Sequence, residues 1–149
     1  RRPGGGRPLV IYLDTSALTK LIRPEPETDP LHRWLRRSTE PWVGSILVEV
    51  ELIRAVRRVS PATLPAALLL LGSLDIMPLD EQVVARAQQL VDPGPRSLDA
   101  IHLATALEIG AVTAFVTYDR RLSTAADAHG LDVAAPGQDP NVTAPTPGQ

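Results

Sequence analysis

The stretch from Leu9 to Ser16 constrains the fold more than any other part of this 149-residue chain. Residues Leu9–Leu13 form a nearly continuous apolar run, which is typical of a strand buried on both faces in a parallel sheet. The run ends abruptly at Asp14, and Thr15 and Ser16 follow, both of which can cap a helix. An acid between a buried strand and a helix lies at the carboxyl edge of a sheet, where open α/β sheets bind ligands. Asp14 is therefore a candidate site residue, although a helix cap explains one such Asp about as well.

The rest of the chain alternates short apolar runs with amphipathic segments that are punctuated by Pro and Gly. This alternation predicts an α/β fold, a parallel sheet with helices on both sides. Strands are expected at 9–13, 41–44, 74–79, 111–117 and 131–134. Helices are expected at 15–22, 30–38, 46–59, from 61 onward, 81–91, 98–109 and 118–129, with caps at Ser45, Asp80 and Ser97 and stops at Gly110 and Gly130.

Composition divides the chain into three parts. Residues 1–8 are expected to form a flexible arm, 9–135 a single domain, and 136–149 a disordered tail without an apolar face. A turn is expected at 92–96. The Leu-rich segment 68–71 is either core or a subunit interface, and the pattern does not separate the two.

The composition also narrows the kinds of site and partner. Cysteine is absent, which excludes disulfides and thiolate metal ligands and fits a reducing cytoplasm. No apolar run is long enough to span a membrane. The net charge of −2 argues against a broadly basic nucleic-acid surface. The positive charge is nevertheless all Arg except for Lys20, and Arg suits phosphate, although solvated helix faces explain the clusters at 33–37, 54–58 and 120–121 at least as well.

Carboxylates occur at four places where the edge of a sheet could gather them. Asp14 and Asp119 each follow a buried strand and precede a helix, so the two lie side by side if their strands are neighbours. Asp99 falls in the first turn of a helix, where the helix dipole alone favours an acid. The helix after Ser45 carries Glu49 and Glu51. Each acid taken alone is explained by a structural role.

The two glutamates point in nearly opposite directions, because they are two positions apart on a helix. A helical wheel places Glu49 among the apolar residues and Glu51 on the polar, Arg-bearing side. The wheel alone therefore predicts that Glu49 is the buried acid. A catalytic acid faces a wet cleft rather than the core, so the polar side does not argue against Glu51.

Gathered together, such acids repel one another unless a cation lies among them. Oxygen ligands without Cys favour Mg²⁺ or Mn²⁺. A carboxylate-bound metal at the edge of a sheet suits phosphoryl transfer, because it polarises a phosphate oxygen and generates hydroxide near neutral pH.

Four motifs resemble those of PIN-domain ribonucleases, specifically the VapC-type toxins of toxin–antitoxin pairs, and the resemblance covers roughly residues 9–135. Their order and spacing fit the family. They read YLDTSAL at 12–18, SILVEVELIRA at 45–55, LDAIHLATA at 98–106 and VTYDRRL at 116–122.

The resemblance implies a three-layer α/β/α sandwich around a central, mainly parallel sheet of four or five strands. It implies an Mg²⁺ or Mn²⁺ site and cleavage of RNA, a homodimer, and a cognate VapB-like antitoxin that covers or enters the acidic pocket. In the family pattern the helix acid comes six residues after the Ser, which selects Glu51 over Glu49. The acids carried over by position are Asp14, Glu51, Asp99 and Asp119. Ser16 and Thr117 match polar supporting positions, and His102 also matches but is more often a packed residue.

The expected mechanism is hydrolysis of an RNA phosphodiester by water that the metal activates. Asp14, Asp99 and Asp119 would hold the metal, and Glu51 would position the water or act as general base. The alternative is a PIN-like module that binds RNA or a partner without cleaving it. A phosphatase of the haloacid-dehalogenase type needs a second Asp two residues after the first, where this chain has Ser16. A response-regulator receiver needs paired acids before the first helix and a late Lys, both of which this chain lacks.

Overall fold

The fold is built on a five-stranded parallel sheet with the strand order β3-β2-β1-β4-β5. The computed structural model describes residues 8–90 and 96–138. Within these residues the sheet confirms the predicted α/β sandwich, and all of its strand pairs are parallel. The strands are β1 (Val10–Leu13), β2 (Trp42–Ser45), β3 (Asp75–Met77), β4 (Val112–Val116) and β5 (Val133–Ala134).

The central strand β1 is buried along its whole length, as the apolar run predicts. Ile11 and Leu13 face one core cluster, whereas Tyr12 faces the other, because successive side chains of a strand point to opposite faces. On its side of the sheet, Tyr12 stacks on Phe115 of β4 with ring centroids 4.9 Å apart. The sheet therefore separates two apolar cores, one under each layer of helices.

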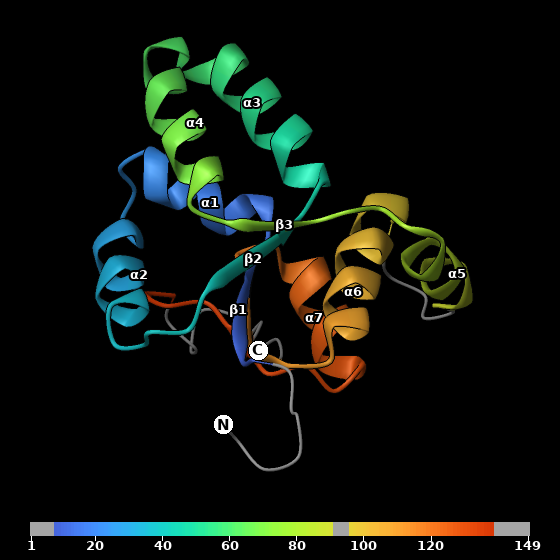
Figure 1. Ribbon diagram of the computed structural model, residues 1–149. Helices are drawn as coiled ribbons and strands as arrows, with labels where there is room; N and C mark the ends of the chain where they lie inside the picture. The colour runs from blue at the N-terminus through green and yellow to red at the C-terminus, as the bar shows by residue number, and fades with distance from the viewer. Residues whose placement is uncertain (1–7, 91–95, 139–149) are drawn as a thin grey trace, which may run out of the picture.

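In the described part of the chain, seven α-helices form the two outer layers (Figure 1). The first four contribute to the core around Ile11 and Leu13, and α6 and α7 cover the Tyr12 face, with α5 packed on α6. They are α1 (Thr15–Ile22), α2 (Thr28–Leu35), α3 (Leu47–Val59), α4 (Leu64–Gly72), α5 (Glu81–Gln89), α6 (Ser97–Ile109) and α7 (Arg120–Ala128), with a 3-10 turn, η1, at Pro61–Thr63 before α4.

Several helix ends follow the predicted caps. The Asp80 carboxylate accepts a hydrogen bond from the backbone N–H of Val83, at 2.9 Å, and so caps α5. Gly110 ends α6 with φ of 69°, a conformation that residues with a Cβ adopt only with strain. The prediction for α3 is wrong by one residue: the helix begins at Leu47 with Ile46 at its N-cap position, although the Ser45 hydroxyl does accept from the backbone N–H of Leu47.

Three further predicted helix starts are wrong. Helix α2 begins at Thr28 rather than Pro30, because a Pro within the first turn removes only an N–H that has no partner inside the helix. Helix α6 has Arg96, not Ser97, at its N-cap position. Helix α7 begins at Arg120, so Tyr118 lies before the helix and Asp119 caps it.

The Leu-rich helix α4 is only partly core. Ala67 is buried and Leu70 and Leu71 pack against the core, whereas Leu68 and Leu69 are exposed. None of the helices in the described residues is long and apolar enough to cross a membrane. Most of the predicted arm, tail and turn lie outside the described residues, which omit 1–7, 91–95 and 139–149.

Candidate active site

Two of the candidate acids lie at adjacent strand ends. Strands β1 and β4 pair in parallel, with Leu13 opposite Val116. Asp14 follows β1 directly, and Asp119 comes three residues after Val116 and caps α7. The two strands that precede these acids are therefore neighbours in the sheet, which is the condition for the acids to lie side by side.

Asp14 is both a helix cap and a buried acid. Its Oδ1 accepts from the Ser16 hydroxyl at 2.7 Å and from the backbone N–H of Ala17 at 2.9 Å. Its Oδ2 accepts from the Thr117 hydroxyl at 2.5 Å, and the residue is only 3% exposed. Capping needs only one of these oxygens, so the second contact to Thr117 indicates that the carboxylate is held for more than capping.

Burial raises the pKa of Asp14 above its ordinary value, and hydrogen bonds from Thr117, Ser16 and Ala17 only partly oppose this effect. The folded protein therefore holds this carboxylate in a place where ionisation is unfavourable. Perturbed acids of this kind cluster at functional sites.

Ser16 and Thr117 join the two strand ends. The Ser16 hydroxyl accepts from the backbone N–H of Tyr118 at 2.8 Å, and the Thr117 hydroxyl accepts from that of Asp119 at 3.1 Å. Since both hydroxyls donate to Asp14, each side chain links that carboxylate to the segment after β4. Each hydroxyl thus supports the carboxylate of Asp14, and the place near a metal that the motifs assign to them stays a prediction.

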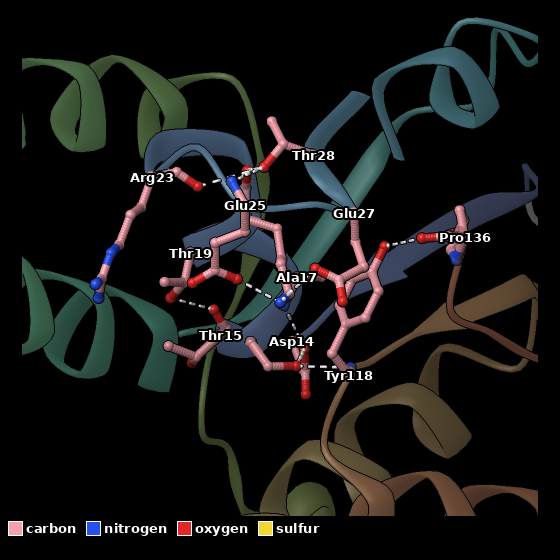
Figure 2. A network of polar contacts seen from close by, with 12 residues as sticks. Asp14, Thr15, Ala17, Thr19, Arg23, Glu25, Glu27, Thr28, Tyr118 and Pro136 are labelled. Carbon is pink, nitrogen blue, oxygen red and sulfur yellow. Dashed lines mark hydrogen bonds and ion pairs between the residues drawn. The ribbon is translucent and has the colours of Figure 1, made fainter. Parts of the chain in front are cut away.

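A second polar network fixes the loop beside Asp14 (Figure 2). The Lys20 ammonium pairs with Glu25 and, at 3.0 Å, with Glu27, and it lies 5.1 Å from the centre of the Tyr118 ring. The Tyr118 hydroxyl donates to the carbonyl of Pro136 at 2.8 Å. These contacts join the C-terminal half of α1 and the loop after it to Tyr118, which follows β4.

Glu51 on α3 faces the site, and Glu49 does not. Glu51 Oε1 accepts from the Thr15 hydroxyl at 2.9 Å and contacts His102 Nε2 at 2.8 Å. Glu49 is exposed, so the buried position that the helical wheel assigns to it is wrong. The apolar side of α3 is occupied by Val48 and its neighbours, and Glu49 lies at the rim of that side.

The ionised form of Glu51 is favoured. Partial burial opposes ionisation, but the hydrogen bonds from His102 and from the Thr15 hydroxyl outweigh it, and they lower the pKa of Glu51. Glu51 therefore stays a carboxylate with one oxygen held by two donors.

Asp99 lies in the first turn of α6 and is half-buried. Burial raises its pKa, and the negative charge of Asp119 raises it further. Asp99 therefore lies within electrostatic reach of Asp119. Its Oδ2 also accepts from the backbone N–H of Arg96 at 3.4 Å.

The atoms that this site can offer to a divalent cation are the carboxylate oxygens of its four candidate acids. Carboxylate oxygens suit Mg²⁺ and Mn²⁺. However, across residues 8–90 and 96–138, no group of three or more Asp, Glu or His side chains is arranged so that it could hold a metal ion. Protein donors occupy both oxygens of Asp14 and one oxygen of Glu51. The chemistry of the site fits such an ion, but the spacing of the acids in this conformation does not.

The motifs gave His102 no role beyond packing, although it lies three positions after Asp99 and so on the same side of α6. It is 3% exposed and lies between the carboxylate of Glu51 and the hydroxyl of Tyr12, 2.8 Å from each. The i, i+3 spacing from an acid was the signal that could have identified it.

A groove of about 640 Å³ borders Glu51. Arg54, Arg57 and Arg58 line it from α3, and all three are exposed. The remaining lining residues are Val50, Ala55 and Leu98. This groove brings one of the three Arg clusters to the acidic site.

The sequence matches the model of the PIN domain over residues 11–128. It is 53% identical, over 133 residues, to a protein named Ribonuclease VapC35 from Mycobacterium tuberculosis, covering 87% of this chain and 98% of that protein. It is 47% identical, again over 133 residues, to Ribonuclease VapC47 from the same species, covering 86% of this chain and 98% of that protein. The chain belongs to the PIN-domain family, and within it to the VapC-type members.

Solved structures show the same fold. VapC20 of Mycobacterium tuberculosis, described as a toxin that cleaves the sarcin–ricin loop, superposes with a TM-score of 0.66 at 18% identity. That match covers 81% of this chain and 95% of VapC20. The architecture of the present chain is thus that of a VapC protein.

Proposed function

We propose that this protein is an endoribonuclease and the toxin of a VapBC-type toxin–antitoxin pair. The observation that carries the proposal is the buried carboxylate of Asp14 at the end of β1, held on both oxygens. Similarity to Ribonuclease VapC35 over nearly the whole of that protein supports the activity. The further acids at this edge of the sheet, Glu51, Asp99 and Asp119, are the other proposed catalytic residues.

We propose that Mg²⁺, or alternatively Mn²⁺, is the cofactor, bound by Asp14, Asp99 and Asp119 with Glu51. The oxygen-only donor chemistry and the repulsion between Asp99 and Asp119 support this assignment. The spacing of the side chains does not, so binding requires some of them to change rotamer. When bound, such an ion supplies positive charge beside a phosphate oxygen and lowers the pKa of water.

The protein's own groups have separable roles in this proposal. Glu51, ionised and with Oε2 not used by its two donors, accepts a proton from the attacking water. Asp14 is fixed by Ser16 and Thr117, so its position does not change as the substrate binds.

The groove beside Glu51 is the proposed path of the RNA backbone. Arg54, Arg57 and Arg58 present guanidinium groups there, and such groups pair with phosphate oxygens in a fork. Phosphate contacts carry little sequence information, so the target RNA would be chosen by shape and unpaired bases.

A cognate VapB-like antitoxin is the proposed protein partner. One of the solved structures with this fold is a toxin–antitoxin complex from Klebsiella pneumoniae, with a TM-score of 0.67 at 18% identity, covering 85% of this chain and 97% of that one. We also propose a homodimer in the cytoplasm. The exposed apolar side chains of Leu68 and Leu69 on α4 support a protein interface.

The test is cleavage of total cellular RNA by the purified protein, free of antitoxin, with Mg²⁺, with Mn²⁺ and with EDTA. The variants are Asp14→Asn and a control, Asp127→Asn, which changes an exposed acid on α7. Discrete fragments that require the metal and Asp14, but not Asp127, are the expected result, and their ends identify the target.

Equal cleavage by Asp14→Asn would overturn the assignment of the site. RNA that is bound but not cut by the folded wild-type protein would favour the non-catalytic binding module. Cleavage that persists in EDTA would overturn the metal proposal alone.

A further inference from the structure

A buried polar chain leads from the core to the site. It begins at Tyr12 of β1, whose hydroxyl lies 2.8 Å from His102 Nδ1. It ends at Glu51 of α3, whose Oε1 lies 2.8 Å from His102 Nε2. Tyr12 is fully buried and His102 is 3% exposed, so both are placed by packing. Three elements far apart in the sequence thus meet in one line of hydrogen bonds.

The chemistry of the two ends fixes which ring nitrogen carries the proton. An ionised carboxylate only accepts, so the nitrogen that faces Glu51, Nε2, carries its hydrogen and donates it. In a neutral ring, Nδ1 then carries no hydrogen and can only accept, and the Tyr12 hydroxyl, which also contacts the Thr105 side chain, lies 2.8 Å from it. Tyr12 therefore donates to Nδ1, and the ring is held in the Nε2–H form.

The ring itself cannot turn easily. Tyr12 stacks on Phe115 at an interplanar angle of 6°, and His102 meets Tyr12 edge-on at 84° with centroids 6.1 Å apart. An immobile donor of this kind restrains the flexible side chain that accepts from it.

Glu51 needs such a restraint because of its neighbours. It lines the groove with Arg54, Arg57 and Arg58, and a guanidinium group is a strong partner for any carboxylate that turns toward it. In the structure its carboxylate instead accepts a hydrogen bond from His102 Nε2. Thr15 and His102 both contact Oε1, and neither of these two donors uses Oε2.

We propose that His102, itself held by Tyr12, is a positioning residue that keeps the carboxylate of Glu51 at the site and away from the arginines of the groove. This inference rests on the proposed nuclease function, because it assigns His102 a part in that reaction. It concerns the orientation of Glu51 and not the binding of RNA.

Two substitutions of similar size separate this role from packing. His102→Gln keeps an N–H near the position of Nε2, and His102→Leu fills the space without a donor. We expect His102→Leu to lower kcat by about 10- to 100-fold, the usual effect of losing a group that orients a catalytic side chain, with KM for RNA nearly unchanged. His102→Gln should recover most of the loss, and thermal unfolding of both variants should show that each is folded.

A spectroscopic readout does not depend on activity. The chain has three histidines, so the ring signals of ¹⁵N-histidine-labelled protein are few, and those missing from His102→Leu belong to His102. We expect an Nε2–H proton that exchanges slowly with water, and we expect Glu51→Ala, but not Asp127→Asn, to shift it and speed its exchange.

Equal losses in the Gln and Leu variants, or a His102 signal indifferent to Glu51→Ala, would overturn the inference. A wild-type protein that cleaves no RNA would instead overturn the proposed function, and the ring signal would still show whether His102 holds Glu51.

Discussion

Asp14 combines two roles with opposite effects on stability. As the N-cap of α1, its carboxylate accepts the backbone N–H of Ala17, which stabilises the helix. As a buried acid with a raised pKa, it makes the folded state less stable whenever it is ionised. A helix cap does not have to be buried, so the unfavourable burial of the Asp14 carboxylate supports a role for this residue in the site.

Asp14→Asn should abolish cleavage and yet stabilise the fold at neutral pH. Because the folded pKa lies above the ordinary value of 3.8, the folded state binds the proton more tightly than the unfolded state. The free energy of unfolding of the wild type therefore falls as pH rises from 3.8 through the raised pKa, by about 1.4 kcal/mol for each tenfold difference in proton affinity. Asn keeps an oxygen for the cap and does not ionise.

Urea unfolding of the wild type and Asp14→Asn at a series of pH values measures this difference. The stability gap should widen as pH rises through that range and then become constant. An Asn variant that is less stable than the wild type at neutral pH would contradict the argument.

Thr117→Val should destabilise the protein by about 1–3 kcal/mol, because it leaves a buried carboxylate oxygen of Asp14 without its donor. It also removes the acceptor for the backbone N–H of Asp119, so cleavage should fall as well. Thr105→Val is a control for the loss of a buried hydroxyl that serves no carboxylate: Thr105 is equally buried, and its hydroxyl donates to the carbonyl of Ile101 and contacts the hydroxyl of Tyr12. Denaturant unfolding should show a clearly smaller loss for the control, and equal losses would contradict the special role of Thr117.

At the scale of the elements, the glycine that ends α6 has a conformational role. Gly110 has φ of 69°, and Gly110→Ala should therefore destabilise by about 1 kcal/mol. Gly72, the last residue of α4, has an ordinary φ, and a Cβ there would meet nothing within 4 Å. Gly72→Ala should be neutral or stabilise by up to about 1 kcal/mol. Thermal or urea unfolding of the pair compares them, and an Ala at 110 that is tolerated as well as one at 72 would contradict the assignment.

The elements could be predicted well because their signals are local. A cap such as Asp80 and a stop such as Gly110 act within one turn. The predicted start of α2 was wrong because Pro30 is compatible with either the first residue of a helix or a later position in its first turn. The helical wheel wrongly predicted that Glu49 is buried. Periodicity shows which side of a helix is apolar, but not how much of that side other elements cover.

At the scale of the whole molecule, the acids are brought together by the order of the strands in the sheet, and this order cannot be predicted from the hydrophobic periodicity of the sequence. Asp14 and Asp119 are neighbours because β4 pairs with β1 rather than with β5 alone. The family motifs supplied the list of acids but not their contacts. The link from His102 to Glu51 joins α6 to α3, and nothing local in either segment predicts it.

The arrangement of charge over the molecule gives a further prediction, since a chain of net charge −2 has to concentrate positive charge where RNA binds. The Arg54, Arg57 and Arg58 cluster lines the groove at Glu51. Changing all three to Gln should weaken RNA binding and reduce its salt dependence by about 2 in the slope of log Kd against log salt, as expected for three lost phosphate contacts on a single strand.

The chain provides its own control in Arg33, Arg36 and Arg37, three exposed arginines on and just after α2. Both triple variants change the net charge equally, so a general loss of attraction would affect them alike. Binding is measured by titrating labelled RNA at several salt concentrations, with Asp14→Asn added to each protein so that the RNA stays intact. If only the groove arginines contact phosphate, the α2 variant keeps nearly the slope of its parent, whereas equal reductions would mean that the RNA senses overall charge and that the groove is not its path.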